Sequence, residues 1–309
     1  MKQSEFAYLG WIQKHLRYQP DVLVGSGDDA AVLRLNKHQR LLATCDMIVE
    51  GVDFKLRTAT ARQIGYKSLA ISLSDLAAMG GVDGPIYALM SVAFKPNTPD
   101  RFAKELFIGM KSLADKFDVA IVGGDVSSTS GPLTINSTLL GSVTKLKSLL
   151  RSGARTGDAI MVTDKLGGSI LGKHLSFTPR LKEALLLNQS YKINSMMDIS
   201  DGLLIDLNHI LSSSNKGALL YEYAIPISKS AYRLGRSNAL KHALTDGEDF
   251  ELLFTASPKE AERIIKDRRL KVPVTIIGQI TNKQGMYIQG LDKQTRLLKP
   301  SGYEHFNRR

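Results

Sequence analysis

Hydrophobic and polar positions form two different patterns along this chain of 309 residues. Short apolar runs bounded by charge or glycine are typical of strands, whereas apolar residues spaced three and four apart are typical of helices. In the first half, the pattern predicts strands at 41–49, 87–94, 119–125 and 133–143 and helices at 61–79 and 101–117. The helix at 61–79 is rich in small residues and should stop at Gly80 and Gly81. Strands and helices therefore alternate in this half of the chain.

A polar, glycine-bearing stretch at 151–158 interrupts this pattern, and an α/β pattern restarts after it. The elements expected beyond it are a helix at 201–211, a strand at 251–257, a helix at 258–268 and a strand at 272–280. We therefore expect an α/β (α+β) protein with mixed sheets flanked by helices. Its two domains are predicted at about 1–148 and 149–309.

The amino-acid composition limits the classes of protein to which the chain can belong. Hydrophobic residues make up 43% and charged residues 23%, as in ordinary soluble domains. The one cysteine, Cys45, excludes an internal disulfide and fits a reducing compartment. The first residues lack the apolar core of a signal peptide, and no apolar run approaches the roughly 18 residues of a membrane span. We expect a cytoplasmic protein without a membrane partner.

The formal charge of +11 raises the question of a nucleic-acid partner. Lys and Arg are spread along the chain, with modest groups only at 266–271 and at the C-terminus. Aromatic residues are 7% and are not interleaved with the basic ones. A basic surface that attracts small anions is the better interpretation, so no nucleic-acid partner is expected.

Although the net charge of the chain is positive, its carboxylates gather in short clusters, most of which are flanked by glycine. The six clusters lie at 25–33, 44–54, 72–81, 121–128, 197–207 and 245–254. Like charges placed together need a compensating cation, and glycine lets the backbone approach a ligand closely. Oxygen ligands without a Cys/His set favour Mg²⁺ over zinc, and Mg²⁺ commonly accompanies phosphate. The clusters therefore suggest phosphate chemistry on several magnesium ions.

Each cluster also has a plain structural interpretation. Asp28 and Asp29 follow two glycines, as in an ordinary Asx-type loop. Asp46 lies in an apolar strand, where an inward-facing acid needs a partner. Cys45 beside it is expected to be a small buried filler, and Asp75 is either a ligand or a solvent-facing helix residue.

The later clusters are similarly open. Asp125 follows two glycines at the end of a predicted strand, where either a ligand contact or a plain turn fits. Asp198 and Asp201 precede a helix, so they either share an ion or cap that helix. Glu248 and Asp249 lie in a turn that enters a strand, and the six histidines show no metal-ligand spacing. Walker A, GxGxxG and protein-kinase signatures are absent, so any use of ATP needs another architecture.

The order of the clusters is more specific than any one of them. GDDAA, TxDxxVEGxxF, SLSDLAAMGG, GGD, DISDGL and GEDFEL follow one another over nearly the whole chain. In this order they resemble thiamine-monophosphate kinases, members of the aminoimidazole ribonucleotide synthetase-like superfamily. The resemblance implies a cytoplasmic homodimer of two-domain, synthetase-like protomers, in which the N-terminal domain carries ATP and Mg²⁺ and dimerises. It implies Mg²⁺-dependent transfer of the ATP γ-phosphoryl group to thiamine monophosphate, giving thiamine diphosphate, with no dedicated catalytic side chain.

The resemblance also implies roles for individual residues. Those matching metal ligands are Asp29, Thr44, Cys45, Asp46, Asp75, Asp125, Asp198 and Asp201. Those matching ATP contacts are Gly124, Asp125, Arg151 and Ser200, and those matching contacts to the thiamine substrate are Asp53, Glu248 and Tyr303. Several positions depart from the usual pattern. Cys45 stands where Thr is common, Asp53 where His is common, Val126–Ser128 in place of a Thr pair, and Thr245–Asp246 in place of a small residue and Gly.

The chemistry fits a site of this composition. A phosphate monoester is mostly a dianion at pH 7, so it needs no strong general base to act as acceptor. The obstacle is repulsion between two anions, which metal ions screen while they align an in-line transfer. Two other interpretations stay open: another ATP-using member of the superfamily, such as aminoimidazole ribonucleotide synthetase, and a non-catalytic nucleotide-binding protein.

Overall fold

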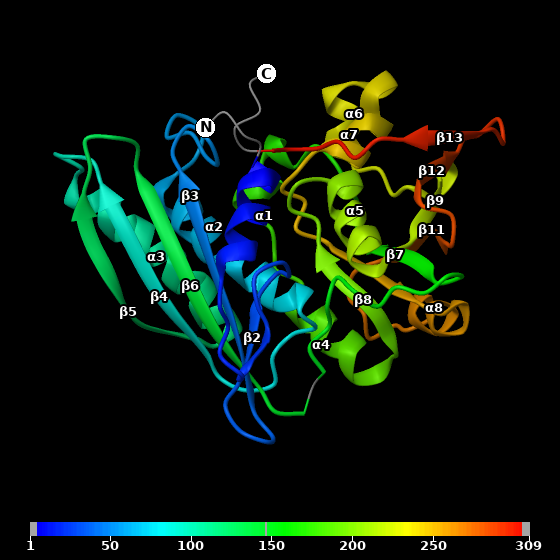
Figure 1. Cartoon of the computed structure of the whole chain (residues 1–309). Helices are drawn as coiled ribbons and strands as arrows, with labels where there is room; N and C mark the ends of the chain where they lie inside the picture. The colour runs from blue at the N-terminus through cyan, green and yellow to red at the C-terminus, as the bar shows by residue number, and fades with distance from the viewer. Residues whose placement is uncertain (1–4, 146, 305–309) are drawn as a thin grey trace.

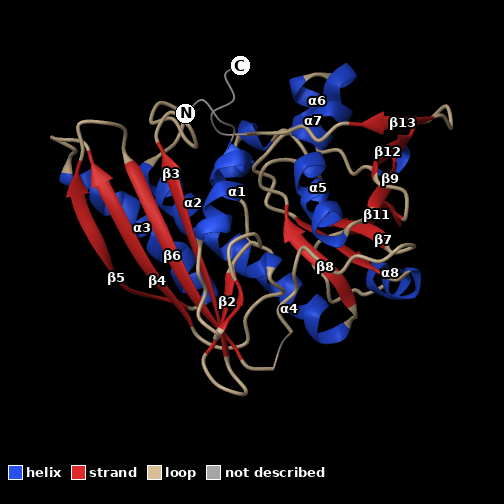
Figure 2. Ribbon diagram, viewed as in Figure 1, coloured by secondary structure: helices blue, strands red, loops and turns tan. Residues whose placement is uncertain are grey.

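The computed structural model of the chain describes residues 5–145 and 147–304. Figures 1 and 2 show two sheets side by side, with helices packed against both. The N-terminal sheet has the strand order β1-β2-β3-β6-β4-β5, and the C-terminal sheet has the order β13-β12-β9-β11-β7-β10-β8. Both sheets are mixed, because β4–β5 and β9–β12 pair in parallel while the other pairs are antiparallel. The expected fold class is confirmed.

The strands of the first sheet are β1 (Val22–Val24), β2 (Ala31–Arg34), β3 (Arg40–Val49), β4 (Ile86–Phe94), β5 (Val119–Ser128) and β6 (Thr134–Val143). Those of the second are β7 (Ala159–Thr163), β8 (Ile193–Asp198), β9 (Gly217–Tyr221), β10 (Leu252–Ala256), β11 (Val274–Thr281), β12 (Gly285–Gln289) and β13 (Thr295–Leu298). The α-helices are α1 (Glu5–His15), α2 (Ala61–Ala78), α3 (Asp100–Phe117), α4 (Leu181–Ser190), α5 (Leu203–Ser214), α6 (Lys229–Leu234), α7 (Ala239–Thr245) and α8 (Pro258–Ile265). Short 3₁₀ turns lie at Ser169–Leu171, Lys173–Leu175, Glu222–Ala224 and Arg236–Asn238.

Helix α2 is the central element of the molecule. Thr60 and Gln63 form a capping box at its start, and Gly80 and Gly81 follow its end. It packs against α3 and against β3 and β6 of the first sheet, and also against α4 and β8 of the second half. A helix with partners on so many sides needs small residues: a Cβ on Gly65 would lie 1.9 Å from the carbonyl oxygen of Leu106 in α3. The small-residue composition of this segment therefore reflects burial on nearly all sides.

Two hydrophobic cores share the second sheet between them. Successive residues of β7 alternate between its two faces, so Ala159 and Met161 belong to one core and Ile160 and Val162 to the other. The first core also contains the residues of α2, α3 and the inner face of the N-terminal sheet. The second lies between the opposite face of the C-terminal sheet and α5. One core therefore runs through both halves of the chain.

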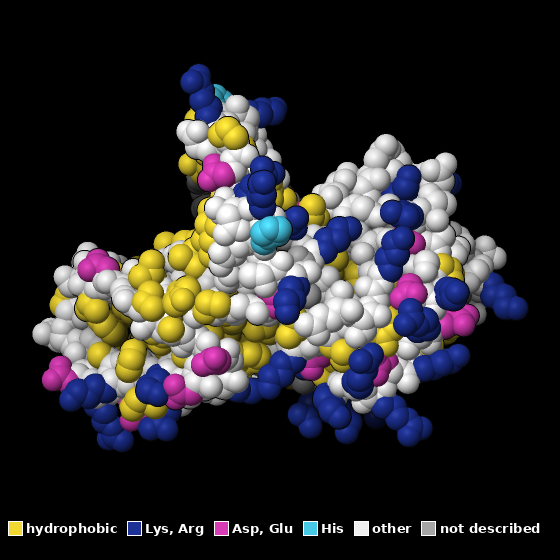
Figure 3. All heavy atoms as spheres, turned by 90° about the horizontal axis from the view of Figure 1, so that it is seen from below, with side chains coloured by type: hydrophobic (Ala, Val, Ile, Leu, Met, Phe, Trp, Pro, Cys, Tyr) yellow, Lys and Arg dark blue, Asp and Glu magenta, His cyan; other side chains and the backbone are white. Residues whose placement is uncertain are grey.

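The outer face of the N-terminal sheet carries exposed apolar side chains, among them Met47, Tyr87 and Leu89. On the face seen in Figure 3, hydrophobic side chains gather over the N-terminal part of the molecule, while Lys and Arg are spread over much of the rest of that face. None of the helices in the described ranges is long and apolar enough to span a membrane.

Two expectations from the pattern need correction. The strand expected at 119–125 continues to Ser128 as β5, so Asp125 lies within the edge strand instead of in a turn after it. Cys45 is exposed and is not a buried filler. The reason is alternation along β3, where Thr44 and Asp46 face α2 and Cys45 faces the uncovered side of the sheet.

Candidate active site

Three carboxylates from distant parts of the sequence meet between the two sheets. Asp29 precedes β2, Asp75 lies in the last turns of α2 and Asp198 ends β8. Each offers an oxygen, and these oxygens all lie within 4.8 Å of one another. Within the described ranges, this is the one group of metal-ligating side chains so close together. The structure thus brings together three of the acids that the sequence proposed as ligands.

Asp46 joins this group from β3. Its carboxylate accepts a hydrogen bond of 2.5 Å from Ser72, and it interacts with the Asp75 and Asp29 carboxylates. Further hydroxyl groups orient the acids, because Thr44 donates to Asp75 and Ser74 donates to Asp198. We call Asp29, Asp46, Asp75 and Asp198 the acidic centre. Its geometry depends on α2, which contributes Ser72, Ser74 and Asp75 itself.

Burial and mutual repulsion raise the pKa values of these acids. Burial raises the pKa of Asp198 to about 7, with a further contribution from the charge of Asp29. Burial also raises the pKa of Asp75 well above its ordinary value, and the charges of Asp46 and Asp198 add to it. Asp28, next to the centre, has a pKa raised to about 6, mainly by burial and then by Asp29. The acidic centre therefore holds more negative charge than its protein surroundings balance.

Arg151 is the cation that meets the acidic centre in the described structure. Its guanidinium lies 2.6 Å from Asp29 Oδ1, and its backbone N–H donates to the carboxylate of Asp28. The Asp29 side chain is 2% exposed, yet its Oδ2 is buried without a hydrogen-bond partner, as is Arg151 Nε. Buried unpaired oxygens are costly, and a hard cation would satisfy them. The donor set of carboxylate oxygens therefore fits Mg²⁺.

The loop between β8 and α5 borders the acidic centre. The carboxylate of Asp206, in the first turn of α5, accepts hydrogen bonds of 3.1 and 3.0 Å from the backbone N–H groups of Asp201 and Gly202. The carbonyl oxygen of Ser200 accepts from Glu248 N at 2.6 Å. The structure thus places Ser200 and Asp201 near Asp198, while Asp201 lies outside the group of three mutually close acids. Sequence reasoning missed Asp206, although its place in the first turn of an apolar helix was a signal.

Asp125 and Cys45 belong to a different surface from the acidic centre. Asp125 pairs with Ser91 in β4, beside the outward-facing Leu89, so strand alternation directs it toward the outer face of the sheet. Cys45 lies on that face too, where its sulfur accepts hydrogen bonds from Asn136 and Thr138. Gly124 is needed at its position, because a Cβ there would lie 1.8 Å from the carbonyl oxygen of Met90. Within one chain, the side chains of Asp125 and Cys45 lie on the opposite face of the sheet from the carboxylate of Asp46.

Two of the three residues proposed for the thiamine end, Asp53 and Glu248, contact the same lysine. Lys67 of α2 is 1% exposed, donates a hydrogen bond of 2.7 Å to the carbonyl oxygen of Asp53 and forms an ion pair with Glu248. The Asp53 carboxylate accepts from Val49 N at 2.7 Å, which closes the turn after β3. Tyr303 N donates to the carbonyl oxygen of Asp201 at 2.9 Å. Lys67 was missed from the sequence, although a lysine within a buried helix was a visible signal.

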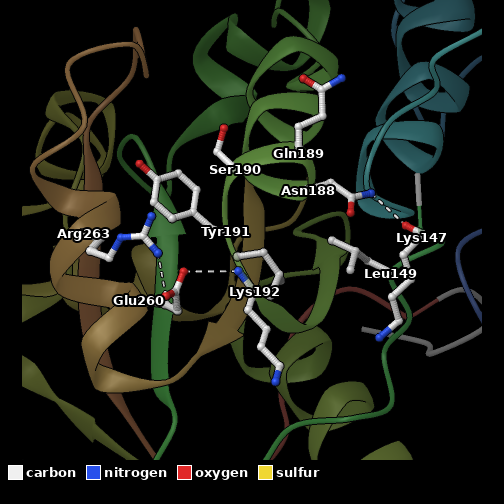
Figure 4. Close-up of a pocket in the computed structure, with 10 residues that line it drawn as sticks. Lys147, Leu149, Asn188, Gln189, Ser190, Tyr191, Lys192, Glu260 and Arg263 are labelled. Atoms are coloured by element: carbon white, nitrogen blue, oxygen red, sulfur yellow. Dashed lines mark hydrogen bonds and ion pairs between the residues drawn. The ribbon is translucent and has the colours of Figure 1, made fainter. Parts of the chain in front are cut away.

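A cavity of about 400 Å³ lies elsewhere, where the segment after β6 meets α4 and α8. Figure 4 shows Lys147, Asn188, Tyr191 and the Glu260–Arg263 pair around it. It contains no residue of the acidic centre. The candidate site is therefore defined by the acidic centre and not by this cavity.

Comparisons with known proteins show the family to which this fold belongs. The family model for the N-terminal domain of AIR synthase related proteins matches residues 27–143, and the model for their C-terminal domain matches residues 139–290. This is the class of two-domain proteins to which the architecture corresponds. The thiamine-monophosphate kinase of Rhodopirellula baltica is 39% identical over 99% of this chain and 97% of its own length. That of Bacillus subtilis is 32% identical over 98% and 99%.

Solved structures agree. The structure of AaThiL complexed with AMPPCP and TMP has a TM-score of 0.85 and 27% identity, and covers 99% of both chains. The thiamine-monophosphate kinase of Stenotrophomonas maltophilia has a TM-score of 0.75 and 33% identity, covering 94% of this chain and 98% of its own. The chain belongs to the thiamine-monophosphate kinase family.

Proposed function

We propose that this protein transfers the γ-phosphoryl group of ATP to thiamine monophosphate, giving thiamine diphosphate and ADP. This is the last step in forming that diphosphate. The observation that carries the proposal is the acidic centre, with four carboxylates and one arginine at the meeting point of the two sheets. Support comes from the full-length relatives named thiamine-monophosphate kinase and from the related structure with an ATP analogue and TMP.

The acidic centre would hold Mg²⁺ through Asp29, Asp46, Asp75 and Asp198. The resemblance also assigns Asp125, Thr44 and Cys45 to metal ions, and Asp201 to a further ion. Bound Mg²⁺ would supply charge neutralisation and alignment of the phosphates. Arg151 lies close enough to the centre to meet a phosphate group, and Ser200 lies in the neighbouring loop. Gly124 and Asp125 complete the proposed ATP contacts, and Asp53, Glu248 and Tyr303 the acceptor contacts.

The site needs no general base for this reaction. The attacking oxygen belongs to a phosphate monoester whose second pKa is about 6, so it is already deprotonated at pH 7. The protein's contribution is to bring two anions together and to keep them in line. The acids of α2, β3 and β8 are fixed by Ser72, Ser74 and Thr44, which limits their rearrangement.

We propose further that two copies associate through the outer face of the N-terminal sheet. Exposed Met47, Tyr87 and Leu89 form the apolar part of this face, and Asp125 lies on the same side. A second copy would bury them, as expected of a homodimer interface. We also propose that the protein is cytoplasmic and has no nucleic-acid partner. We place the boundary between its two domains at 148/149.

The deciding experiment measures ADP release with ATP and Mg²⁺ and a panel of acceptors. The panel contains thiamine monophosphate, free thiamine and formylglycinamidine ribonucleotide. We expect that thiamine monophosphate is the only acceptor of the panel that supports turnover. This turnover should be lost in excess chelator. Turnover only with the ribonucleotide would overturn the proposal in favour of a synthetase.

A further inference from the structure

A fully buried lysine joins the two halves of the protein beside the acceptor residues. Lys67 lies in α2 and is 1% exposed. An ammonium group removed from water is costly unless charged or polar partners replace the water. Two such partners are present, the carbonyl oxygen of Asp53 at 2.7 Å and the carboxylate of Glu248. One is in the turn after β3 and the other in the loop before β10, so a single ammonium group ties these two loops together.

The loop that carries Glu248 has an unfavourable backbone conformation. Glu248 has a φ of 64° and Phe250 a φ of 50°, values in the left-handed region that residues with a Cβ seldom adopt. Hydrogen bonds hold the loop in place: Glu248 N donates to Ser200 at 2.6 Å, and Gly167 N donates to the buried Asp249 carboxylate at 2.7 Å. Strained backbone persists only where the surroundings fix it, and such positions gather at ligand sites.

In the Lys67–Glu248 ion pair, only the glutamate is accessible to solvent. The Lys67 side chain is 1% exposed, whereas that of Glu248 is 28% exposed. The lysine therefore supports the carboxylate from within the protein, and the carboxylate keeps a side available to a ligand. The Asp53 carboxylate is engaged by Val49 N, so Lys67 meets Asp53 through its backbone and fixes the position of the whole turn.

We infer that Lys67 is the positioning residue of the acceptor pocket: it fixes Glu248 and the Asp53 turn in the geometry that receives thiamine monophosphate. This inference rests on the proposed function. The acceptor carries a cationic thiazolium ring and an amino group, both suited to a carboxylate held at a fixed place. Lys67 acts through Glu248 and the turn and does not touch the reacting phosphates. Its loss should therefore weaken acceptor binding while leaving ATP binding intact.

The test is a double-mutant cycle with Lys67→Met, Glu248→Gln and the combined variant, each nearly isosteric with the wild type. In Lys67→Met we expect the KM for thiamine monophosphate to rise at least about tenfold, with the KM for ATP within about twofold of wild type. In the combined variant the acceptor KM should rise by clearly less than the product of the two single rises, because the lysine acts in part through that carboxylate and in part through the Asp53 turn. Lys111→Met is the matched control, since Lys111 pairs with Asp115 on the exposed face of α3, and it should change neither KM.

Additive effects in the combined variant would overturn the inference, as would an unchanged acceptor KM in Lys67→Met or an equal rise in the KM for ATP. If Lys67→Met does not fold, the combined variant, which leaves no unpaired buried charge, is compared with Glu248→Gln. Failure of the combined variant to fold would also count against the inference, because the lysine would then act independently of Glu248. A wild type inactive with thiamine monophosphate would refute the proposed function instead. The pairing of Lys67 with Glu248 would then be judged from the same cycle in urea unfolding, where additive changes would overturn it.

Discussion

Two regions of this molecule bury carboxylates, and they treat them in opposite ways. In the acidic centre, four aspartates meet one guanidinium, and an oxygen of Asp29 has no partner. In the C-terminal half, the buried Glu251 carboxylate accepts hydrogen bonds from two cations and a hydroxyl group. These partners are Arg180 and Lys173, each at 2.7 Å, and Thr163 at 2.6 Å, and with Glu251 they form what we call the Glu251 cluster.

The difference shows which buried charges serve the fold and which serve a ligand. The charge of the Glu251 carboxylate is compensated by the chain's own side chains, so this carboxylate needs no ligand. The acidic centre has an excess of negative charge that burial makes worse, as the raised pKa values of Asp75 and Asp198 show. A fold keeps such an arrangement only where something else supplies the missing cations.

The substitution Asp75→Asn tests most directly whether the acidic centre serves a ligand and not the fold. We expect turnover to fall by about 1,000-fold or more, equivalent to about 4 kcal/mol, because a central ligand is lost. Without Mg²⁺, the unfolding temperature should rise, because the substitution removes one of several repelling charges. ADP release and thermal unfolding in chelator measure the two effects. Wild-type turnover would remove Asp75 from the site, and Asp115→Asn on α3 is the exposed control.

Glu251→Gln should have the opposite profile. It removes the ion-pair partner of Lys173 and leaves Arg180 with only the Asp164 carboxylate, which should lower the free energy of unfolding by about 3 kcal/mol. Turnover per folded molecule should fall far less than in Asp75→Asn. Urea unfolding monitored by circular dichroism gives the first quantity. A stability equal to that of the wild type would mean that the partners of Glu251 do not stabilise the fold as described above.

The pH dependence separates the two regions further. The pKa of Asp198 is raised to about 7 and that of Asp28 to about 6, so the folded protein binds more protons than the unfolded chain between about pH 4 and pH 7. These groups therefore make the metal-free protein less stable as pH rises through that window. Mg²⁺ requires the deprotonated acids, so its affinity should rise about tenfold from pH 6 to pH 8. Calorimetric titration with Mg²⁺ tests this, and a pH-independent affinity would contradict it.

The smallest effect is expected for Cys45→Thr. The side chain is exposed on the outer face of the sheet, opposite to the neighbouring Asp46. Turnover should stay within about twofold and stability within about 0.5 kcal/mol, as for most surface substitutions. A loss of activity comparable to that of Asp75→Asn would show that the Cys45 side chain, and not only its backbone, belongs to the site.

Much of the fold could be predicted from the sequence because its elements have strong local signals. Helices α2 and α3 and strands β3, β4 and β6 lie within about a residue or two of the predicted ranges, since glycine stops and apolar spacing are local features. Asp46 could also be proposed, because an acid in an apolar strand requires a partner. Joining it to Asp29, Asp75 and Asp198 required the order of the motifs.

What could not be predicted depends on which side of a strand is covered. Cys45 was expected to be buried, but its exposure follows from the packing of α2 on the other face of β3. The direction of Asp125 depends on a register irregularity between β4 and β5 near Ala88, which no local pattern reveals. Lys67 has its two partners 14 positions before it and 181 after it in the chain, so only the tertiary structure brings them together.

Because α2 contributes to a core that runs through both halves, the halves depend on each other to fold. The second half presents one face of its sheet to α2 and α4, and without the first half that apolar face would meet water. Thermal melting should accordingly be a single cooperative transition, even though two separate sheets are present. The same helix carries Asp75, so the ligands of the candidate site assemble only when the whole chain has folded.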